Sequence, residues 1–331
     1  MPLLRGSLLR RRLAIQLPCA LGAGGRLAVH AQRAPARIGF LTPSAPPQYE
    51  QAFWDEMRRL GHVPGETIVV ESRSAEGRFE RLPALAAELV ALKVDVIVGV
   101  VTQASVAARD ATATIPIVMV GVADPVGAGL VQSLARPGAN VTGTSIVVAE
   151  VVGKQLELLR QLMPLASRVA VLWNPANDVL QRQLLTRARE AAARLSLQLQ
   201  PVEARTPNDV EQAFDAMRTS RVNALLIMAD PMLARQARSI ARLAAQHRIV
   251  AVGATRVFVE AGIVASYGPH FVDSFRRAAG YVDRILKGAR PGDLAVEQSA
   301  TFELVINAGS ARRLGVTIPR SVALRADQVI E

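Results

Sequence analysis

Several residue types and sequence patterns are scarce or absent in this chain of 331 residues, and each absence argues against a class of function. Cysteine occurs once, at Cys19, and histidine four times. Aromatic residues make up 4% of the chain, too few for the stacking platforms that bind single-stranded nucleic acid. No apolar run reaches the roughly 18 residues of a membrane span.

Sequence motifs for catalysis and cofactor binding are also missing. The chain has no P-loop and no G-x-S-x-G elbow, and the glycines between Gly121 and Gly129 lack the third glycine of a dinucleotide fingerprint. His62, His247 and His270 share no metal-ligand spacing with one another or with acidic residues. No nucleophile, base and orienting group can be assembled from the sequence. We therefore expect no metal and no cofactor, and a binding protein is favoured over an enzyme.

The first 31 residues have the composition of an export signal. They contain five arginines and no acidic residue, followed by a moderately apolar stretch from Leu13 to Val29. Val29-His30-Ala31 is a small-residue cleavage site, so we expect residues 1–31 to be removed and the protein to be periplasmic. The sequence leaves the export route open, general or twin-arginine. A lipid anchor is not expected, because Pro18 stands before Cys19 where a small residue is required.

Removal of this segment changes the composition of the chain in two ways. The exported chain contains no cysteine, which excludes disulfides and thiol chemistry. Its formal net charge falls from +11 to +6, and the remaining basic residues are dispersed over the expected helices. Such a distribution favours solvated helix faces over nucleic-acid binding.

The stretch from Val94 to Ala135 predicts strand, helix, strand and helix. Its opening run, 94–101, has one charged residue and is typical of a strand buried on both faces. A helix is expected to begin near Thr102 and a second strand to span 115–120. Asp124-Pro125 then predicts another helix start, with Asp as the N-cap and Pro in the first turn.

The same strand-and-cap pattern recurs at Thr42-Pro43, Asn174-Pro175 and Asp230-Pro231. In open parallel sheets, ligands bind at the carboxyl ends of the strands, where these residues are expected to lie. The alternative is that each residue only caps a helix and touches no ligand. The two series of alternating strands and helices predict an α/β protein with two parallel sheets covered by helices.

Six segments of the chain carry a resemblance to a known family. They are EGRFERLPALAAELVALKVDVIV (76–98), DPVGAGLVQSLARPGANVTGTS (124–145), RVAVLWNPAN (168–177), FVEAGIVASYGP (258–269), FELVIN (302–307) and LRADQVIE (324–331). From about residue 37 to the end, the chain resembles the ABC-transporter substrate-binding proteins of the type that includes tryptophan-binding members.

This resemblance implies a type I periplasmic-binding-protein fold: two doubly wound parallel-sheet lobes, three crossings between them and a ligand cleft. We expect the N-terminal lobe to comprise 36–144 and about 265–296, and the C-terminal lobe 145–264 and 297–331, with crossings at 143–145 and 261–268. The resemblance also implies capture of a small amino-acid-like solute, its delivery to an ABC permease in the membrane, and a monomer that binds no nucleic acid.

One position departs from the family pattern. Relatives are expected to have an aromatic residue near Gly253, where this chain has Gly253-Ala254. The small residues argue against a stacked aromatic ligand and leave room for a different solute side chain.

The solute is expected to be an amino acid or a close analogue, clamped at its charged ends. Thr102, Gln103 and Ala104 open a helix whose free N–H groups suit a carboxylate. Asp124 and Asp230 can meet the ammonium group. Further candidates for the site are Asn174, Tyr267 and Thr42. Two other functions stay open: an enzyme of the doubly wound class that acts on a small acid, and a sensory ligand-binding module.

Overall fold

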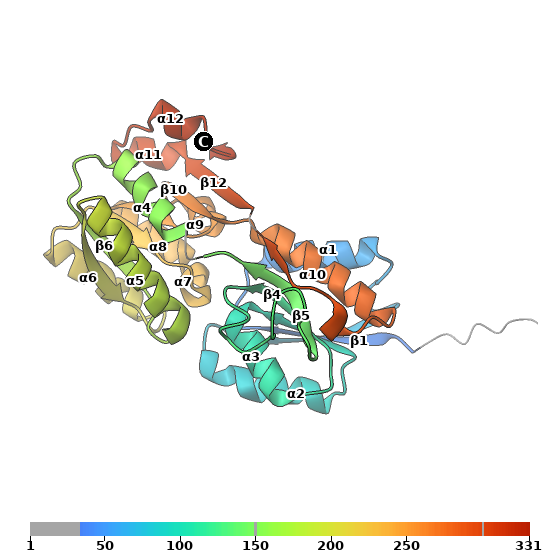
Figure 1. Cartoon of the computed structure of the whole chain (residues 1–331). Coiled ribbons are helices and arrows are strands. Elements are labelled where there is room, and N and C mark those ends of the chain that lie inside the picture. Colours follow the sequence, from blue (N-terminus) through green and yellow to red (C-terminus); the bar gives the residue numbers. More distant parts are fainter. Residues whose placement is uncertain (1–33, 149–150, 300) are drawn as a thin grey trace, which may run out of the picture. The chain divides into compact units, whose positions relative to one another are not determined.

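A computed structural model describes residues 34–148, 151–299 and 301–331, and the expected export segment lies outside these ranges. Strands and helices alternate along the described chain (Figure 1). The strands form one sheet of six and one sheet of seven, and all pairs but one are parallel. The prediction of an α/β protein with two doubly wound, mainly parallel sheets is confirmed.

The six-stranded sheet belongs to the first lobe and has the order β11-β5-β4-β3-β1-β2. Every residue of β3, β4 and β5 is buried, as expected for strands covered on both faces. The strands are β1 Ala36–Thr42, β2 Ile68–Ser74, β3 Val96–Val100, β4 Ile117–Val122, β5 Val141–Ile146 and β11 Glu297–Ser299.

Two pairs of helices cover this sheet (Figure 1). Helices α1 (Pro47–Arg59) and α10 (Phe271–Leu286) pack on one face, and α2 (Leu82–Ala91) and α3 (Val101–Ala111) pack on the other. Short 3-10 helices span Phe79–Arg81 and Pro291–Asp293. Each face therefore has its own apolar core.

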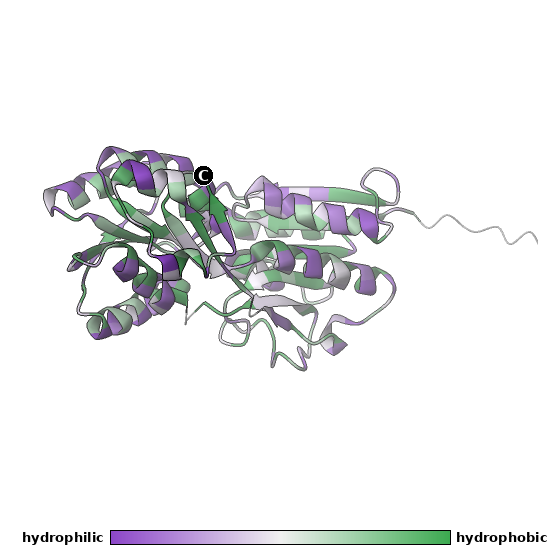
Figure 2. Ribbon diagram, turned by 90° about the horizontal axis from the view of Figure 1, so that it is seen from above, coloured by the Kyte–Doolittle hydropathy of each residue, from purple (hydrophilic) through white to green (hydrophobic). Residues whose placement is uncertain are grey.

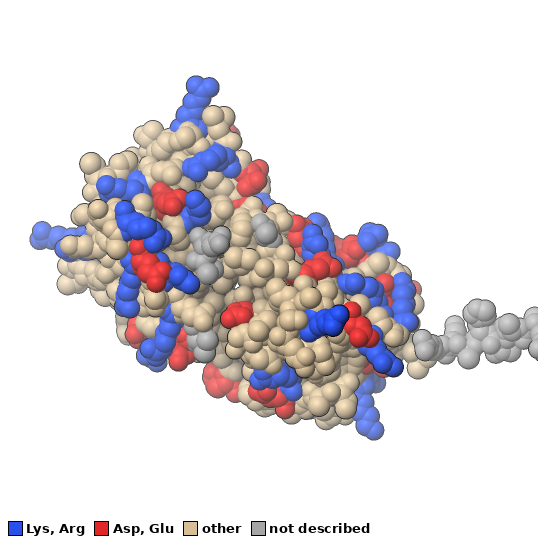
Figure 3. Space-filling model, in the orientation of Figure 1, with Lys and Arg blue, Asp and Glu red and all other residues tan. Residues whose placement is uncertain are grey.

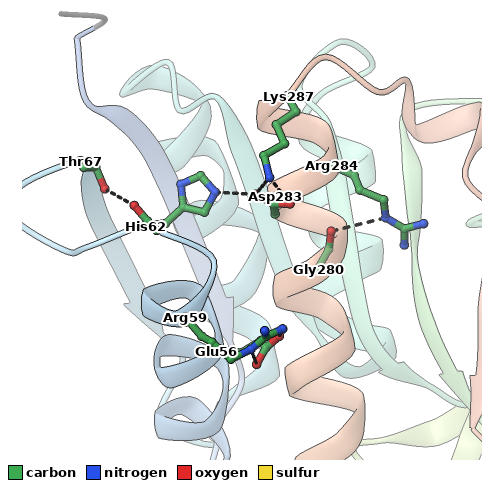
Figure 4. Close-up of polar contacts among 9 residues, drawn as sticks. Glu56, Arg59, His62, Thr67, Gly280, Asp283, Arg284 and Lys287 are labelled. Atoms are coloured by element: carbon green, nitrogen blue, oxygen red, sulfur yellow. Dashed lines mark hydrogen bonds and ion pairs between the residues drawn. The ribbon is translucent and has the colours of Figure 1, made fainter.

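The ends of α1 and α10 are joined by an ionic cluster (Figure 4). His62 Nε2 lies 2.9 Å from Asp283 Oδ1, and Lys287 Nζ donates to Asp283 Oδ2 at 2.9 Å. Burial alone would raise the pKa of Asp283, but the hydrogen bonds from Lys287 and His62 outweigh burial and lower it. The cluster therefore favours the ionised carboxylate where the two helices meet.

The seven-stranded sheet belongs to the second lobe and has the order β13-β12-β10-β9-β8-β6-β7. Only the β10–β12 pair is antiparallel among the described strands. The strands are β6 Arg168–Trp173, β7 Gln198–Glu203, β8 Ala224–Ile227, β9 Val250–Gly253, β10 Ala265–Pro269, β12 Phe302–Asn307 and β13 Gln328–Ile330.

Helices also cover both faces of this second sheet. Helices α4 (Val151–Leu162) and α5 (Asp178–Arg194) lie on one face. The other face packs against α6 (Asp209–Thr219), α7 (Pro231–Arg235), α8 (Ala237–Gln246) and α9 (Arg256–Glu260). The chain ends with α11 (Ala308–Leu314) and α12 (Arg320–Ala323) beside β13. In Figure 2 the strands are mostly hydrophobic and the helices carry hydrophilic residues, the pattern of a covered sheet.

The lobe boundaries differ from those expected. Strand β10 pairs with β9, so residues 265–269 belong to the second sheet, whereas β11 pairs with β5 and assigns residues 297–299 to the first. The chain therefore crosses between lobes after β5, between β10 and α10, and between β11 and β12. The expected crossings at 143–145 and 261–268 lie within strand β5 and within the segment from α9 to β10.

Three of the four expected helix caps are wrong. Thr42 and Asn174 do not cap a helix, because α1 begins after Pro46 and α5 after Asn177. Asp124-Pro125 begins a series of turns instead of a helix, because Gly129 adopts a left-handed φ of 66° a few residues later. Asp124 Oδ1 accepts a hydrogen bond from Gly127 N at 2.8 Å, which closes a local turn. By contrast, Asp230 caps α7 as predicted.

The surface in Figure 3 carries Lys and Arg side chains interspersed with Asp and Glu, without a large patch of one sign on this face. Many of these charges form surface ion pairs within one helix, such as Arg58 with Asp55 and Lys154 with Glu157. Across the described ranges, every helix is too short or too polar to cross a membrane.

Candidate functional site

The topology of the two sheets points to one site. In each sheet the first strand lies between the second and the third, giving the orders β2-β1-β3 and β7-β6-β8. Ligands of such sheets bind at the carboxyl ends where the strand order reverses. Residues after all four central strands line a single cavity: Ser44 after β1, Gln103 after β3, Asn177 after β6 and Asp230 after β8.

The cavity has a volume of about 80 Å³ and a mostly apolar wall. Four aromatic residues contribute to the wall: Tyr49, Phe258, Phe271 and Phe275. The Tyr49 ring stacks on Phe271 and on Phe275 with centroid distances of 5.7 Å. Since a water molecule needs about 10–15 Å³, the cavity has room for several waters or a small solute group.

Asp230 is the one charged side chain among the described residues that line this cavity. The residue is 5% exposed, and its carboxylate accepts four hydrogen bonds. Oδ1 accepts from Met232 N at 2.9 Å, Leu233 N at 3.0 Å and Asn174 Nδ2 at 3.2 Å, while Oδ2 accepts from Asn177 Nδ2 at 3.1 Å. No basic side chain of the described ranges forms an ion pair with it. Burial raises its pKa, and the four hydrogen bonds oppose that rise.

Buried amides hold the neighbours of this carboxylate in place. Gln181 Nε2 donates to Ala229 O at 2.7 Å, and Gln181 Oε1 accepts from Asn174 N at 3.2 Å. Asn174 Oδ1 accepts from Ala176 N at 2.9 Å. Asn174, Asn177 and Gln181 are all at most 2% exposed. Such a satisfied polar network fixes the orientation of the carboxylate.

On the first lobe, the N-terminus of α3 faces the same cavity. Val101 begins the helix with φ of 57°, an uncommon conformation for a β-branched residue, and no side chain caps this end. Gly99 permits the tight turn, since a Cβ there would lie 2.9 Å from Ser105 Cα. The first N–H groups of a helix have no carbonyl partner within it, so this end favours an anion.

The structure brings together three of the predicted site residues. Thr102, Gln103 and Asp230 line the cavity. Asn174 does not line the cavity but donates a hydrogen bond to Asp230, which does. Ala104 is fully buried in the first turn of α3 and its side chain is not part of the wall.

The other three predicted residues lie elsewhere. Thr42 is buried at the end of β1 and does not line the cavity. Asp124 is exposed and lines an outer groove, because its turn leads away from the cavity. Tyr267 lines a separate groove with Lys154 and stacks on Phe302 at 5.9 Å. The sequence pattern places a residue at the end of a strand. It does not reveal whether the side chain points into the cavity or away from it.

Sequence reasoning missed Asn177 and the aromatic wall. Asn177 had a signal, since it lies three residues after Asn174 in the same strand-to-helix loop. Phe271 and Phe275 stand four residues apart on α10, a helix that returns from the second lobe to the first. Their role depends on non-local packing, for which no local pattern exists. The same holds for Tyr49 on α1.

The small residue at Gly253 has a different consequence from the one expected. A Cβ at Gly253 would lie 2.8 Å from Phe258 Cβ and Cδ2, so the glycine gives space to the Phe258 side chain. Phe258 in turn lines the cavity. An aromatic wall is therefore present although position 253 has no side chain.

The family match and a characterised relative both point to substrate-binding proteins. Residues 45–330 match the family described as ABC transporter substrate binding protein. A tyrosine-binding protein of Clostridioides difficile (strain R20291) is 26% identical over 265 residues, which are 80% of this chain and 76% of that protein.

Solved structures agree with the sequence match. A conserved domain protein from Vibrio cholerae O1 biovar eltor is 31% identical, with a TM-score of 0.81 over 89% of this chain and 100% of the other. The ABC domain in complex with L-Trp from Streptococcus pneumoniae is 27% identical, with a TM-score of 0.81 over 90% of this chain and 100% of the other.

Proposed function

We propose, because the chain belongs to the family of ABC transporter substrate binding proteins, that it captures a free amino acid or a close analogue for an ABC importer. One observation carries the proposal. The buried Asp230 carboxylate has no cationic partner among the described residues and lines a mostly apolar cavity between the carboxyl ends of two sheets.

The ammonium group of the solute meets Asp230. A buried carboxylate without a counter-ion is costly, and a solute ammonium supplies the missing charge in a desolvated position. The four hydrogen bonds hold the carboxylate before the solute arrives, so little ordering remains to be done on binding.

The carboxylate of the solute lies at the N-terminus of α3. Thr102 contributes its hydroxyl beside the free N–H groups of the first turn. The two charged ends of an amino acid are then held by different lobes, the carboxylate by the first and the ammonium by the second. A solute that lacks either end loses its hold on one lobe.

The side chain of the solute is uncharged and largely apolar. Apart from Asp230, the described wall residues offer neutral groups, among them the hydroxyls of Ser44 and Thr255 and the four aromatic rings. A charged solute side chain would be buried there without a partner, at a cost of several kcal/mol. Tyrosine and tryptophan, which two of the relatives bind by name, belong to this class.

The wider role follows from the family. We propose that the chain is exported to the periplasm with loss of residues 1–31. There it acts as a monomer, hands its solute to a membrane permease and catalyses no reaction. The apolar cavity with one carboxylate supports this role over the enzyme alternative, because among the described residues Asp230 is hydrogen-bonded to amides and backbone N–H groups and to no hydroxyl that it could activate.

Calorimetry with the twenty protein amino acids tests the proposal. We expect one solute to bind with a stoichiometry of one, and to stabilise the fold by about 2.7 kcal/mol at a hundredfold excess over its dissociation constant. In a protein of this size, that gain raises the melting temperature by several degrees. Mass spectrometry of the bound solute should show it unchanged. Conversion to a product, or no binding by any amino acid or analogue, would refute the function.

A further inference from the structure

The inner cavity and an outer groove share part of their walls. The outer groove has a volume of about 420 Å³ and lies between the beginnings of α3 and α5. Five residues line both spaces and therefore form the partition between them. They are Thr102, Gln103, Ala123, Asn177 and Leu180.

One hydrogen bond crosses this partition from lobe to lobe. Gln103 on α3 donates from Nε2 to Oδ1 of Asn177, which precedes the first residue of α5. Asn177 is 2% exposed, so its amide is nearly dry. The bond closes the side of the cavity that faces the outer groove.

The orientation of the Asn177 amide is dictated by Asp230. An ionised carboxylate only accepts hydrogen bonds, so Asn177 must present Nδ2 to Asp230 Oδ2, at 3.1 Å. Its oxygen then faces the first lobe and requires a donor there. Gln103 supplies that donor by turning Nε2 toward Asn177. The amide thus connects the charged group of the cavity to the bond that closes it.

We propose that Gln103 and Asn177 form the gate of the solute site, and that Asn177 is a positioning residue through which the Asp230 carboxylate sets the gate's hydrogen bond. The solute enters and leaves through the outer groove. This proposal rests on the proposed function for the identity of the solute, but the gate itself can be measured without it.

Spin labels report the gate directly. Cys19 is the one cysteine of the chain, so once it is replaced by Ser, Glu80→Cys on the first lobe and Arg187→Cys on the second, both exposed, can be labelled cleanly. Electron–electron distances are measured without solute and with a mixture of the twenty protein amino acids at 1 mM each. We expect a short-distance, closed population in the parent that grows with the mixture.

Removal of the gate bond should open the lobes. Gln103→Ala is expected to reduce the ratio of closed to open molecules about fivefold, which corresponds to a hydrogen bond worth about 1 kcal/mol. The matched control is Gln183→Ala, an exposed amide in the same outer groove for which no hydrogen bond is found among the described residues. The control should leave the ratio unchanged.

Two further variants distinguish a gate from a simple wall contact. In Gln103→Glu the donor becomes an acceptor opposite Asn177 Oδ1, so the lobes should open at pH 7 and close again as the new carboxyl group gains its proton, near pH 4. In Asp230→Asn the amide of Asn177 is free to turn and can present Nδ2 to residue 103, so adding Asp230→Asn to Gln103→Glu should restore the closed population at pH 7.

The results that would overturn the gate differ from those that would overturn the proposed function. Equal distances for Gln103→Ala, Gln183→Ala and the parent would overturn the gate, as would a parent with no closed population under either condition. A pH-independent Gln103→Glu protein would also overturn it. If the parent closes without solute but no amino acid binds in calorimetry, the gate stands and the proposed function fails.

Discussion

Replacing Asp230 with asparagine should separate solute binding from stability. The change keeps the size of the side chain and keeps an oxygen at Oδ1, where three of the four hydrogen bonds end. The cap of α7 therefore survives. The loss is confined to the charge and to the acceptor opposite Asn177.

The expected loss of affinity is large. Removing one partner of a buried charge pair costs roughly 2–5 kcal/mol, or roughly 30-fold to several thousandfold in the dissociation constant, because the other charge is left unpaired. Calorimetry with the amino acid that binds the parent most tightly measures this loss. Asp124→Asn is the control: Asp124 is exposed and lines the outer groove, so its removal should change affinity less than threefold.

Although Asp230→Asn should weaken solute binding, it should not lower the stability of the ligand-free protein. Because burial raises the pKa of Asp230, the folded state holds its proton more tightly than the unfolded state does. The free energy of unfolding then falls as pH rises through the folded pKa, by about 1.4 kcal/mol for each unit of upward shift. A neutral amide removes this cost, so Asp230→Asn should be at least as stable as the parent at pH 7.

Two results would contradict this reasoning about Asp230. A variant that binds the solute within threefold of the parent would mean that the carboxylate is only a helix cap. A ligand-free variant that is less stable than the parent by more than about 2 kcal/mol in urea would mean that the charge itself supports the fold.

Three further predictions concern stability. Arg248 holds a left-handed φ of 53° at the end of α8, so Arg248→Gly should raise the free energy of unfolding in urea by about 1 kcal/mol; a decrease would contradict the strain. Gly268→Ala should destabilise by about 1–3 kcal/mol or more, because its Cβ would lie 1.8 Å from Ala254 O, whereas Gly280→Ala, with open space inside α10, should not destabilise. Asp283 has a lowered pKa, so Asp283→Asn should lower the melting temperature at pH 5–7, and the difference should shrink as pH falls below about 4; an unchanged difference at pH 2.5 would refute the linkage.

The sequence predicted the parts of the fold that depend on local patterns. Apolar runs such as 94–101 identified the buried strands, and the strand-and-cap pattern placed Asp230 at the mouth of a parallel sheet. Asp230 could be found from its own segment, because an Asp-Pro pair directly after the apolar run 224–229 is a local signal for a helix cap at a strand end. The same pattern failed at Asp124, where glycines three and five residues later favour turns over a helix.

The remaining features depend on contacts between distant segments. Residues 265–269 and 297–299 were assigned to the wrong sheets because three to five residues carry too little pattern to reveal their pairing partners. Tyr49 joins the cavity only because α10 brings Phe271 and Phe275 against it. Burial of a residue can be predicted from its own segment, whereas the cavity that it lines cannot.

The late return of the chain to the first lobe has a consequence for the order of folding. Helix α10 covers one face of the first sheet with Phe275 and Tyr281, both 1% exposed, and β11 completes its edge. The second sheet in turn needs β12 and β13, which end at residue 330. A chain growing from its N-terminus therefore leaves part of one face of the first sheet uncovered until its last sixty or so residues have been made, because α1 alone covers only the rest of that face. Neither sheet is therefore complete until segments near the end of the chain have been made.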